Sequence, residues 1–211
     1  MSIYLGNNQI RQVYLGDKKV SKMYLGSQLI YSGQNLVYTF VPETGELNRE
    51  VFVSNAKTIS SDGIVSIPEY VEMISSDNKP IMCAVVGVGI NPNTLVGAFT
   101  YDNRVKEVIL SDNIRFIDAL SFHGCNNLLK INIPRTVTEI GGNISNPNSD
   151  LRGAAFGACK MLKSVIFENT SGWRIKEGTS YSSISSSDLE NPAIAATYLN
   201  VVYQNNYWIH N

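Results

Sequence analysis

Residues 122–141 read FHGCNNLLKINIPRTVTEIG, and the apolar residues in this stretch stand at short, regular offsets. The segment from Leu128 to Ile133 predicts a short strand, because side chains two residues apart point to the same face of a strand. Pro134, Arg135 and Thr136 supply turn chemistry, and a second short extended piece follows from Val137 to Ile140. The stretch therefore predicts one turn of a coil, with two short strands joined at a corner.

The same pattern occurs on both sides of this stretch. Phe99 stands 23 residues before Phe122, and Phe156 stands 34 residues after it. The earlier unit continues with Asp102, Val105, Val108, Leu110, Ile114 and Ile117, and the later one with Cys159, Leu162, Val165 and Phe167. The longer second interval comes from extra residues within 141–153, and a degenerate unit begins near Ile67-Pro68. The repeat is therefore the main organising feature of the chain.

Repeats of this kind stack into a solenoid, because residues at fixed offsets point inward and pack on their equivalents in the next unit. Equivalent strands then pair in parallel about 4.8 Å apart. The Phe-x-x-Cys segment predicts a helical or 3₁₀ turn on the opposite side. Cys125 and Cys159 share one offset, and we expect two buried thiols there in preference to a disulfide or a metal pair.

The repeat block Ala-Phe-x-x-Cys-x-x-Leu-x-x-Val/Ile-x-Ile-Pro-x-x-Val-x-x-Ile-Gly resembles the BspA-type leucine-rich repeat over residues 64–171. That resemblance implies a leucine-rich-repeat solenoid with an adhesive architecture. Residues 172–211 are similar to the segment that closes such arrays, and we expect them to form a helical cap. A short helix would begin at Ser187 or Asp188 and run through Leu199. The side chains expected to cover the last unit are Trp173, Tyr198, Leu199, Tyr203 and Trp208.

A second repeat occupies residues 1–32, where Tyr-Leu-Gly recurs with a period of 10 residues. Each unit predicts strand, polar turn, strand, and the three together predict a small antiparallel β meander. Such a meander buries too little to stand alone, so we expect it to dock on something larger. The expected docking residues are Tyr4, Leu5, Tyr14, Leu15, Tyr24 and Leu25. The decapeptide resembles N-terminal segments of bacteriophage structural proteins, and that resemblance implies docking on a virion.

Composition argues against several functions. The chain has 211 residues, a net charge of −1 and 17% charged residues, so it lacks the basic excess of a nucleic-acid binder. No apolar run approaches the roughly 18 residues of a membrane helix, and no classical secretory signal is recognisable. Two histidines and three cysteines offer no catalytic, metal or cofactor constellation, and the 141–153 segment has only Asp150 as a carboxylate for calcium. We therefore expect no enzyme activity, metal or cofactor.

The expected recognition surface combines outward strand positions with the 141–153 insertion, taken as a protruding loop. Its residues are Ile109, Asn132, Ile166, Asn143, Asn146, Asn148 and Asp150. Exposed isoleucines on a sheet suggest a contact surface. The alternative, slightly favoured, is that residues 34–60 cover this face. Within the connector at residues 33–63, the segments 36–40 and 49–53 predict a β-hairpin.

We expect a mainly β fold with short helical turns, in which a meander precedes the leucine-rich-repeat solenoid and a helical cap closes it. The leading hypothesis is a non-enzymatic structural or adhesion protein of the bacteriophage virion, made in the bacterial cytoplasm. Its expected partners are other virion proteins, further copies of itself as a homo-oligomer, and a host cell-surface glycan or protein. The alternative is a bacterial cell-surface adhesin-type leucine-rich-repeat binding module.

Overall fold

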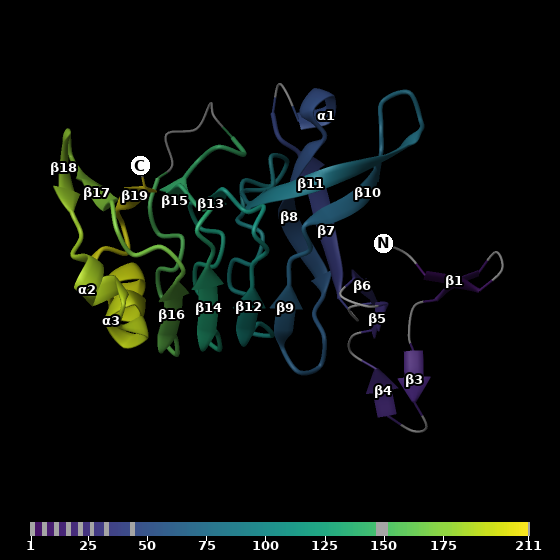
Figure 1. Ribbon diagram of the computed structural model, residues 1–211, viewed down its shortest axis with the longest axis horizontal. Helices are drawn as coiled ribbons and strands as arrows, with labels where there is room; N and C mark the ends of the chain where they lie inside the picture. Colours follow the sequence, from purple (N-terminus) through teal and green to yellow (C-terminus); the bar gives the residue numbers. More distant parts are fainter. Residues whose placement is uncertain are drawn as a thin grey trace.

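The computed structural model is built mainly from β-strands, which confirms the predicted fold class at that level. It describes residues 34–42, 45–146 and 152–210, together with the backbone of six short strands between residues 3 and 31. Two sheets contain the described strands of the repeat units, and they run alongside one another through the length of the repeat region (Figure 1).

The smaller sheet is a ladder of four parallel strands, one from each successive unit. Its strands are β9 (Ile64–Ser66), β12 (Glu107–Ile109), β14 (Lys130–Ile133) and β16 (Ser164–Phe167). The central row of this ladder consists of four apolar residues in register, all of them buried: Val65, Val108, Ile131 and Val165. The predicted parallel pairing of equivalent strands is therefore present in these four units.

The larger sheet has nine strands. Its centre is parallel and consists of β8 (Glu50–Thr58), β11 (Pro80–Val88), β13 (Phe116–Asp118) and β15 (Glu139–Gly142). Antiparallel strands flank this centre: β7 (Asn35–Phe40), β10 (Tyr70–Ile74), β17 (Trp173–Glu177), β18 (Ser180–Ser183) and β19 (Tyr207–His210). The predicted hairpin of residues 36–40 with 49–53 is confirmed, because Phe40 pairs with Val51 and Tyr38 with Val53. The helix α1 (Gly45–Asn48) precedes β8.

The core lies along a column of aromatic rings and thiols, which we call the aromatic column. Phe122 stacks between Phe99 and Phe156, with 5.2 Å between ring centroids on each side and planes within 8° of parallel. Each ring begins a tight turn closed by a bond from the backbone N–H three residues later, as from Cys125 to Phe122. The predicted turn at Phe-x-x-Cys is therefore confirmed. Cys125 and Cys159 are free and buried, as predicted.

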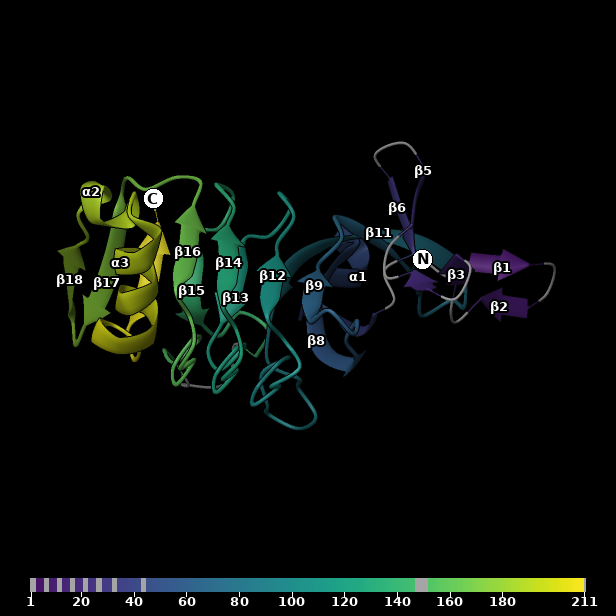
Figure 2. The same cartoon turned by 90° about the horizontal axis from the view of Figure 1, so that it is seen from below.

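The C-terminal segment closes one end of the four-stranded sheet, where α3 (Pro192–Thr197) lies beside β16 (Figure 2). The single helix predicted from Ser187 or Asp188 is wrong. A short α2 (Ser186–Leu189) ends before Asn191, whose side chain accepts hydrogen bonds from the N–H groups of Ala193 and Ile194 and so begins a second helix. Pro192 fits that first helical position because it has no N–H to satisfy. A π-helical turn (Tyr198–Val202) follows, and β17–β19 make this region partly β.

The N-terminal decapeptides form three separate two-stranded hairpins. Their strands are β1 (Ile3–Leu5) with β2 (Asn8–Ile10), β3 (Val13–Leu15) with β4 (Lys18–Val20), and β5 (Met23–Leu25) with β6 (Gln28–Tyr31). The single meander that the sequence predicts is therefore wrong. Each unit carries glycine at the turn between its own strands, whereas Arg11-Gln12 and Ser21-Lys22 between units lack the glycine that tight hairpin turns favour.

Candidate functional site

The outer face of the four-stranded sheet presents two apolar side chains to solvent. Ile109 is 42% exposed and Ile166 is 40% exposed, although the residues directly before and after each of them in the chain are buried. Ile109 pairs with Ser66, and Asn132 pairs with Ile166, so one row of side chains crosses all four strands. The structure thus places Ile109, Asn132 and Ile166 on a common face, which we call the sheet face.

The described residues of 34–60 leave Ile109 and Ile166 exposed, so the expectation that they would cover the sheet face is wrong, although the Gln34 side chain binds the backbone of Ser66 at the edge of the sheet. Residues 34–60 form β7, α1 and β8, which belong to the nine-stranded sheet or adjoin it. Strand β8 pairs with β7 in antiparallel fashion and with β11 in parallel. These pairings satisfy the backbone hydrogen-bonding groups of the segment within that sheet. Ile109 and Ile166 are consequently left with about two-fifths of their surface exposed.

Polar groups on the sheet face are already engaged with neighbouring strands. The half-buried Asn132 uses its carboxamide to bind the backbone of Leu110. Lys130 forms an ion pair with Glu107 at 3.4 Å, in which 48% of the lysine side chain and 32% of the glutamate side chain are exposed. Such exposed pairs contribute little to stability. The sheet face therefore combines two available apolar side chains with polar groups of modest net charge.

The 141–153 insertion begins inside the fold, so the expectation of a protruding loop is wrong for residues 141–146. Asp118 has no exposed surface, and its carboxylate accepts hydrogen bonds from the N–H groups of Ile144 and Ser145 and from the Ser145 hydroxyl. The same hydroxyl accepts a bond from Ile90 N at 2.8 Å. Burial raises the pKa of Asp118, although its hydrogen bonds with Ser145 oppose the shift. These contacts fix the beginning of the insertion to β13 and to the end of β11.

The predicted recognition residues of the insertion consequently do not form one exposed group. Asn143 is only 3% exposed, which removes it from the surface, while Asn146 is half-buried. Asn148 and Asp150 lie outside the described residues. Ile144 packs against a small second core of Phe52, Val86 and Phe116. The described part of the insertion therefore covers apolar surface on the nine-stranded sheet.

The predicted docking residues of the decapeptide repeat fall on three strands. Tyr4 and Leu5 belong to β1, Tyr14 and Leu15 to β3, and Tyr24 and Leu25 to β5. Their side chains lie outside the described residues. The docking role that the sequence predicts for these six residues stays a prediction.

Three titratable groups outside the sheet face make structural contacts. His210 lies with its ring 5.1 Å from that of Trp173, and its Nε2 is 3.1 Å from Nδ2 of Asn169. The Cys125 and Cys159 thiols donate to carbonyl oxygens of Phe99 and Phe122, and burial raises the pKa of Cys159 to about 12. Across the described residues, no three side chains of His, Cys, Asp or Glu gather as metal ligands. In the same residues, no helix has the length and apolarity to cross a membrane.

Sequence reasoning missed a cleft of about 480 Å³ between the end of β8 and residues 91–104. Its lining is polar and apolar in equal measure. The polar side chains include Asn55, Asn91, Thr94, Asp102 and Arg104, and the lining residue Tyr101 has 66% of its surface exposed. One feature of the sequence could have drawn attention to this cleft. Tyr101 occupies the repeat position at which the next two units have Gly124 and Ala158.

One known repeat family matches part of the chain. Residues 95–195 match the family model described as the BspA type leucine-rich repeat region, in 6 copies, which supports the predicted resemblance over that part of the chain. The match does not include the decapeptide repeat. No curated protein matches the chain.

Two solved structures resemble the chain. One is a leucine-rich repeat protein from Bacteroides ovatus, with 27% identity and a TM-score of 0.43 over 62% of this chain and 27% of that one. The other is a leucine rich cell surface protein from Faecalibacterium prausnitzii, with 16% identity and a TM-score of 0.42 over 72% of this chain and 33% of that one. The chain therefore spans about a quarter to a third of the length of these proteins.

Proposed function

We propose that this protein is a non-enzymatic, bacterial-type leucine-rich-repeat binding module, and that the sheet face contacts its partner. The observation that carries the proposal is the exposure of Ile109 and Ile166 within the four-stranded sheet. The central row of the same strands is entirely buried, so the two isoleucines are apolar surface that the fold itself does not use. The match of residues 95–195 to the BspA type repeat supports a binding role over a catalytic one.

The architecture suits recognition because the sheet face is held rigid. Its strands pair with one another in register, and the aromatic column supports them from within. A preorganised surface loses little conformational entropy when it binds. Exposed apolar side chains surrounded by polar ones are also typical of protein contact sites.

The test substitutes both isoleucines and measures retention of a partner. Immobilised protein is incubated with solubilised bacterial envelope, and retained proteins are quantified for the wild type and for Ile109→Ser/Ile166→Ser. We expect the double variant to lose the partner that the wild type retains. Ile74→Ser is the matched control, because Ile74 is 57% exposed but lies on β10 in the nine-stranded sheet. Equal retention by both variants would show that the sheet face is not the interface.

A second candidate function rests on the decapeptide repeat. Three units of the same pattern each form an individual hairpin, as a repeated docking element would. Residues 1–33 carry Arg11, Lys18, Lys19 and Lys22 against Asp17, whereas the rest of the chain is net acidic. A basic docking segment on an acidic body favours attachment to an acidic assembly. We propose that this segment attaches the protein to a larger particle, of which a bacteriophage virion is the example that the sequence suggests.

Deleting residues 1–32 tests the second candidate. We expect the truncated protein to keep the unfolding midpoint of the full chain in urea, because the described core starts at residue 36. Purified particles from cells producing the truncated protein should then lack it, whereas particles made with the full chain should contain it. Incorporation of the truncated protein at the wild-type level would refute the docking role.

A further inference from the structure

Tyr101 is an exposed aromatic residue held in a conformation that disfavours it. Its φ is 59°, in the left-handed region, and 66% of its surface is exposed. Gly124 and Ala158 occupy the equivalent position in the next two units, with φ of 70° and 59°. The repeat therefore imposes this backbone conformation, which glycine adopts most readily. A tyrosine at this place is not explained by burial.

The ring of Tyr101 is fixed by the following unit. A Cβ atom at Gly124 would overlap Cδ1 and Cε1 of the tyrosine, so the ring rests where glycine leaves room for it. The ring also meets His123 edge-on, with 5.4 Å between centroids and 83° between planes. Two contacts from one neighbouring unit thus hold the ring still while two-thirds of the residue stays accessible. Strained, exposed and well-supported residues are characteristic of binding sites.

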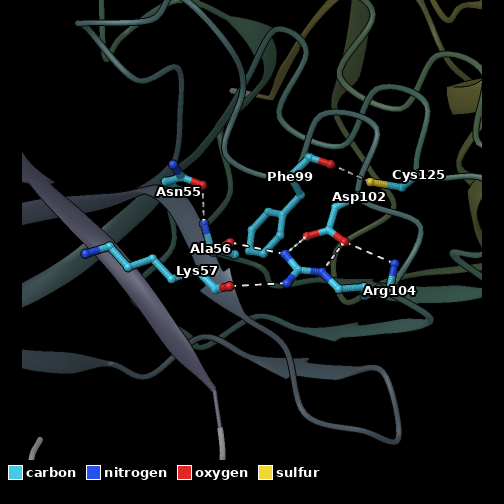
Figure 3. Close-up of polar contacts among 7 residues, drawn as sticks. All are labelled: Asn55, Ala56, Lys57, Phe99, Asp102, Arg104 and Cys125. Atoms are coloured by element: carbon cyan, nitrogen blue, oxygen red, sulfur yellow. Dashed lines mark hydrogen bonds and ion pairs between the residues drawn. The ribbon is translucent and has the colours of Figure 1, made fainter.

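The two charged residues that line the cleft beside Tyr101 neutralise each other. Arg104 binds the Asp102 carboxylate through Nε at 2.8 Å and through a terminal nitrogen at 2.6 Å (Figure 3). Its guanidinium also donates to the carbonyl oxygens of Ala56 and Lys57, both at 3.2 Å. Most of the donors of Arg104 are therefore already used, so this residue fixes the cleft wall and offers little to an anion.

The other lining groups are uncharged. Asn55 is exposed, and its side-chain oxygen accepts a hydrogen bond from Ala56 N at 2.7 Å (Figure 3). The carboxamide oxygen of Asn91 accepts bonds from the N–H groups of Asn93 and Thr94, which orients that side chain at the cleft rim. The NH₂ group of each asparagine is the donor that a hydroxyl-bearing ligand would use.

We propose that this cleft binds a neutral oligosaccharide, with one sugar ring stacked on Tyr101. A pyranose has an apolar C–H face, which fits an aromatic ring, and hydroxyl groups at its edge, which fit the carboxamides of Asn55 and Asn91. A cleft without net charge favours such a ligand over a phosphate or an acidic peptide. The site is distinct from the sheet face, so it does not rest on the function proposed above.

A neutral-glycan microarray followed by calorimetric titration of the best-retained oligosaccharide tests the proposal on the full chain. We expect binding by the wild type, and we expect Tyr101→Gly to weaken it by about tenfold or more, as loss of a central aromatic contact does. Tyr101→Trp should retain binding. Because glycine adopts this backbone conformation freely, Tyr101→Gly should unfold at the same urea concentration as the wild type or at a higher one. That result would separate the loss of binding from a loss of folding.

Tyr70→Ala is the matched control, since Tyr70 is 55% exposed but lies on β10. It should bind the selected oligosaccharide as the wild type does. The proposal fails if the array retains no neutral glycan, if only anionic glycans are retained, or if Tyr101→Gly binds with unchanged affinity. Equal weakening by Tyr70→Ala would also overturn it, because the binding would then not depend on the cleft.

Discussion

The side chain of Asn132 binds both backbone groups of Leu110 in the preceding unit. Leu110 N donates to Oδ1 at 2.7 Å, and Nδ2 donates to Leu110 O at 3.0 Å. Leu110 directly follows β12, so the asparagine continues the hydrogen bonding of the ladder beyond the end of that strand. Only an amide presents a donor and an acceptor side by side in this way. Asn132 therefore joins two units of the repeat.

Replacing Asn132 with leucine should lower the free energy of unfolding by about 1–3 kcal/mol, because the N–H and carbonyl of Leu110 lose their partners in a half-buried place. Urea unfolding followed by circular dichroism measures the change. Lys130→Ala on the same strand removes only an exposed ion pair and should change stability by less than about 0.5 kcal/mol. Similar losses for the two variants would mean that the Asn132 bonds contribute nothing specific.

Ala158 has a φ of 59° and an exposed side chain, so glycine there should stabilise the protein. Relief of about 1–2 kcal/mol of backbone strain exceeds the extra entropy that glycine brings to the unfolded chain, which is about 0.5–1 kcal/mol. We expect a gain of up to about 1 kcal/mol in urea unfolding for Ala158→Gly. Ala193→Gly within α3 is the contrasting control and should cost about 0.5–1 kcal/mol. A loss of stability in both variants would contradict the prediction.

The three cysteines should resist alkylation in the folded protein. All are buried, and burial raises the pKa of each thiol, to about 12 for Cys159. Because the thiolate is the reactive form, iodoacetamide at pH 8 should leave Cys83, Cys125 and Cys159 unmodified over hours. Mass spectrometry after the same treatment in guanidinium should show three modifications. Rapid labelling of Cys125 in the native protein would be incompatible with its place in the aromatic column.

The buried carboxyl of Asp118 should make stability fall as pH rises. Burial raises its pKa above the value of 3.8 expected when the chain is unfolded, so the native state holds this proton more tightly. The resulting stabilisation is complete below pH 3.8 and is lost as pH rises through the raised pKa. In urea unfolding from pH 4 to pH 8, the wild type should therefore lose more stability with rising pH than Asp118→Asn does.

Asp112→Asn is the control for this experiment, because Asp112 is exposed and should leave the pH dependence unchanged. Glu139 lies close enough to raise the pKa of Asp118 further, so Glu139→Gln should reduce the pH dependence in part. An identical pH dependence in the wild type and in Asp118→Asn would refute the role assigned to this carboxyl.

The repeat offsets predicted the structure wherever one residue meets its own equivalent. Phe99, Phe122 and Phe156 stack because a fixed interval within each unit brings equal side chains into register. The same reasoning placed Cys125 and Cys159 in the core and Ile109 and Ile166 on the outside. In each of these cases the neighbour is the same motif, so reading one unit indicates the surroundings of the next.

The sequence-based prediction failed where a residue contacts a residue that is not its equivalent in the next unit. The polar character of residues 141–153 suggested a protruding loop, yet Asn143 is buried and Ser145 binds Asp118. The C-terminal region has two short helices, and Asn191 caps the second of them, whereas the sequence predicted one helix from Ser187 or Asp188 because all three residue types are good N-caps. Decapeptide units with identical strand patterns close on themselves, so the pattern could not tell a meander from individual hairpins.

By itself the sequence determined the repeat, the parallel pairing of equivalent strands and the identity of the core column. Periodic apolar residues can be buried together in few other ways. Only the tertiary structure decided that Asn132 binds Leu110, that Asp118 holds the start of the insertion and that the Tyr101 ring rests over Gly124. Each of these contacts joins residues of unlike type from different units. Their existence depends on distances across the stack, which spacing along the chain does not specify.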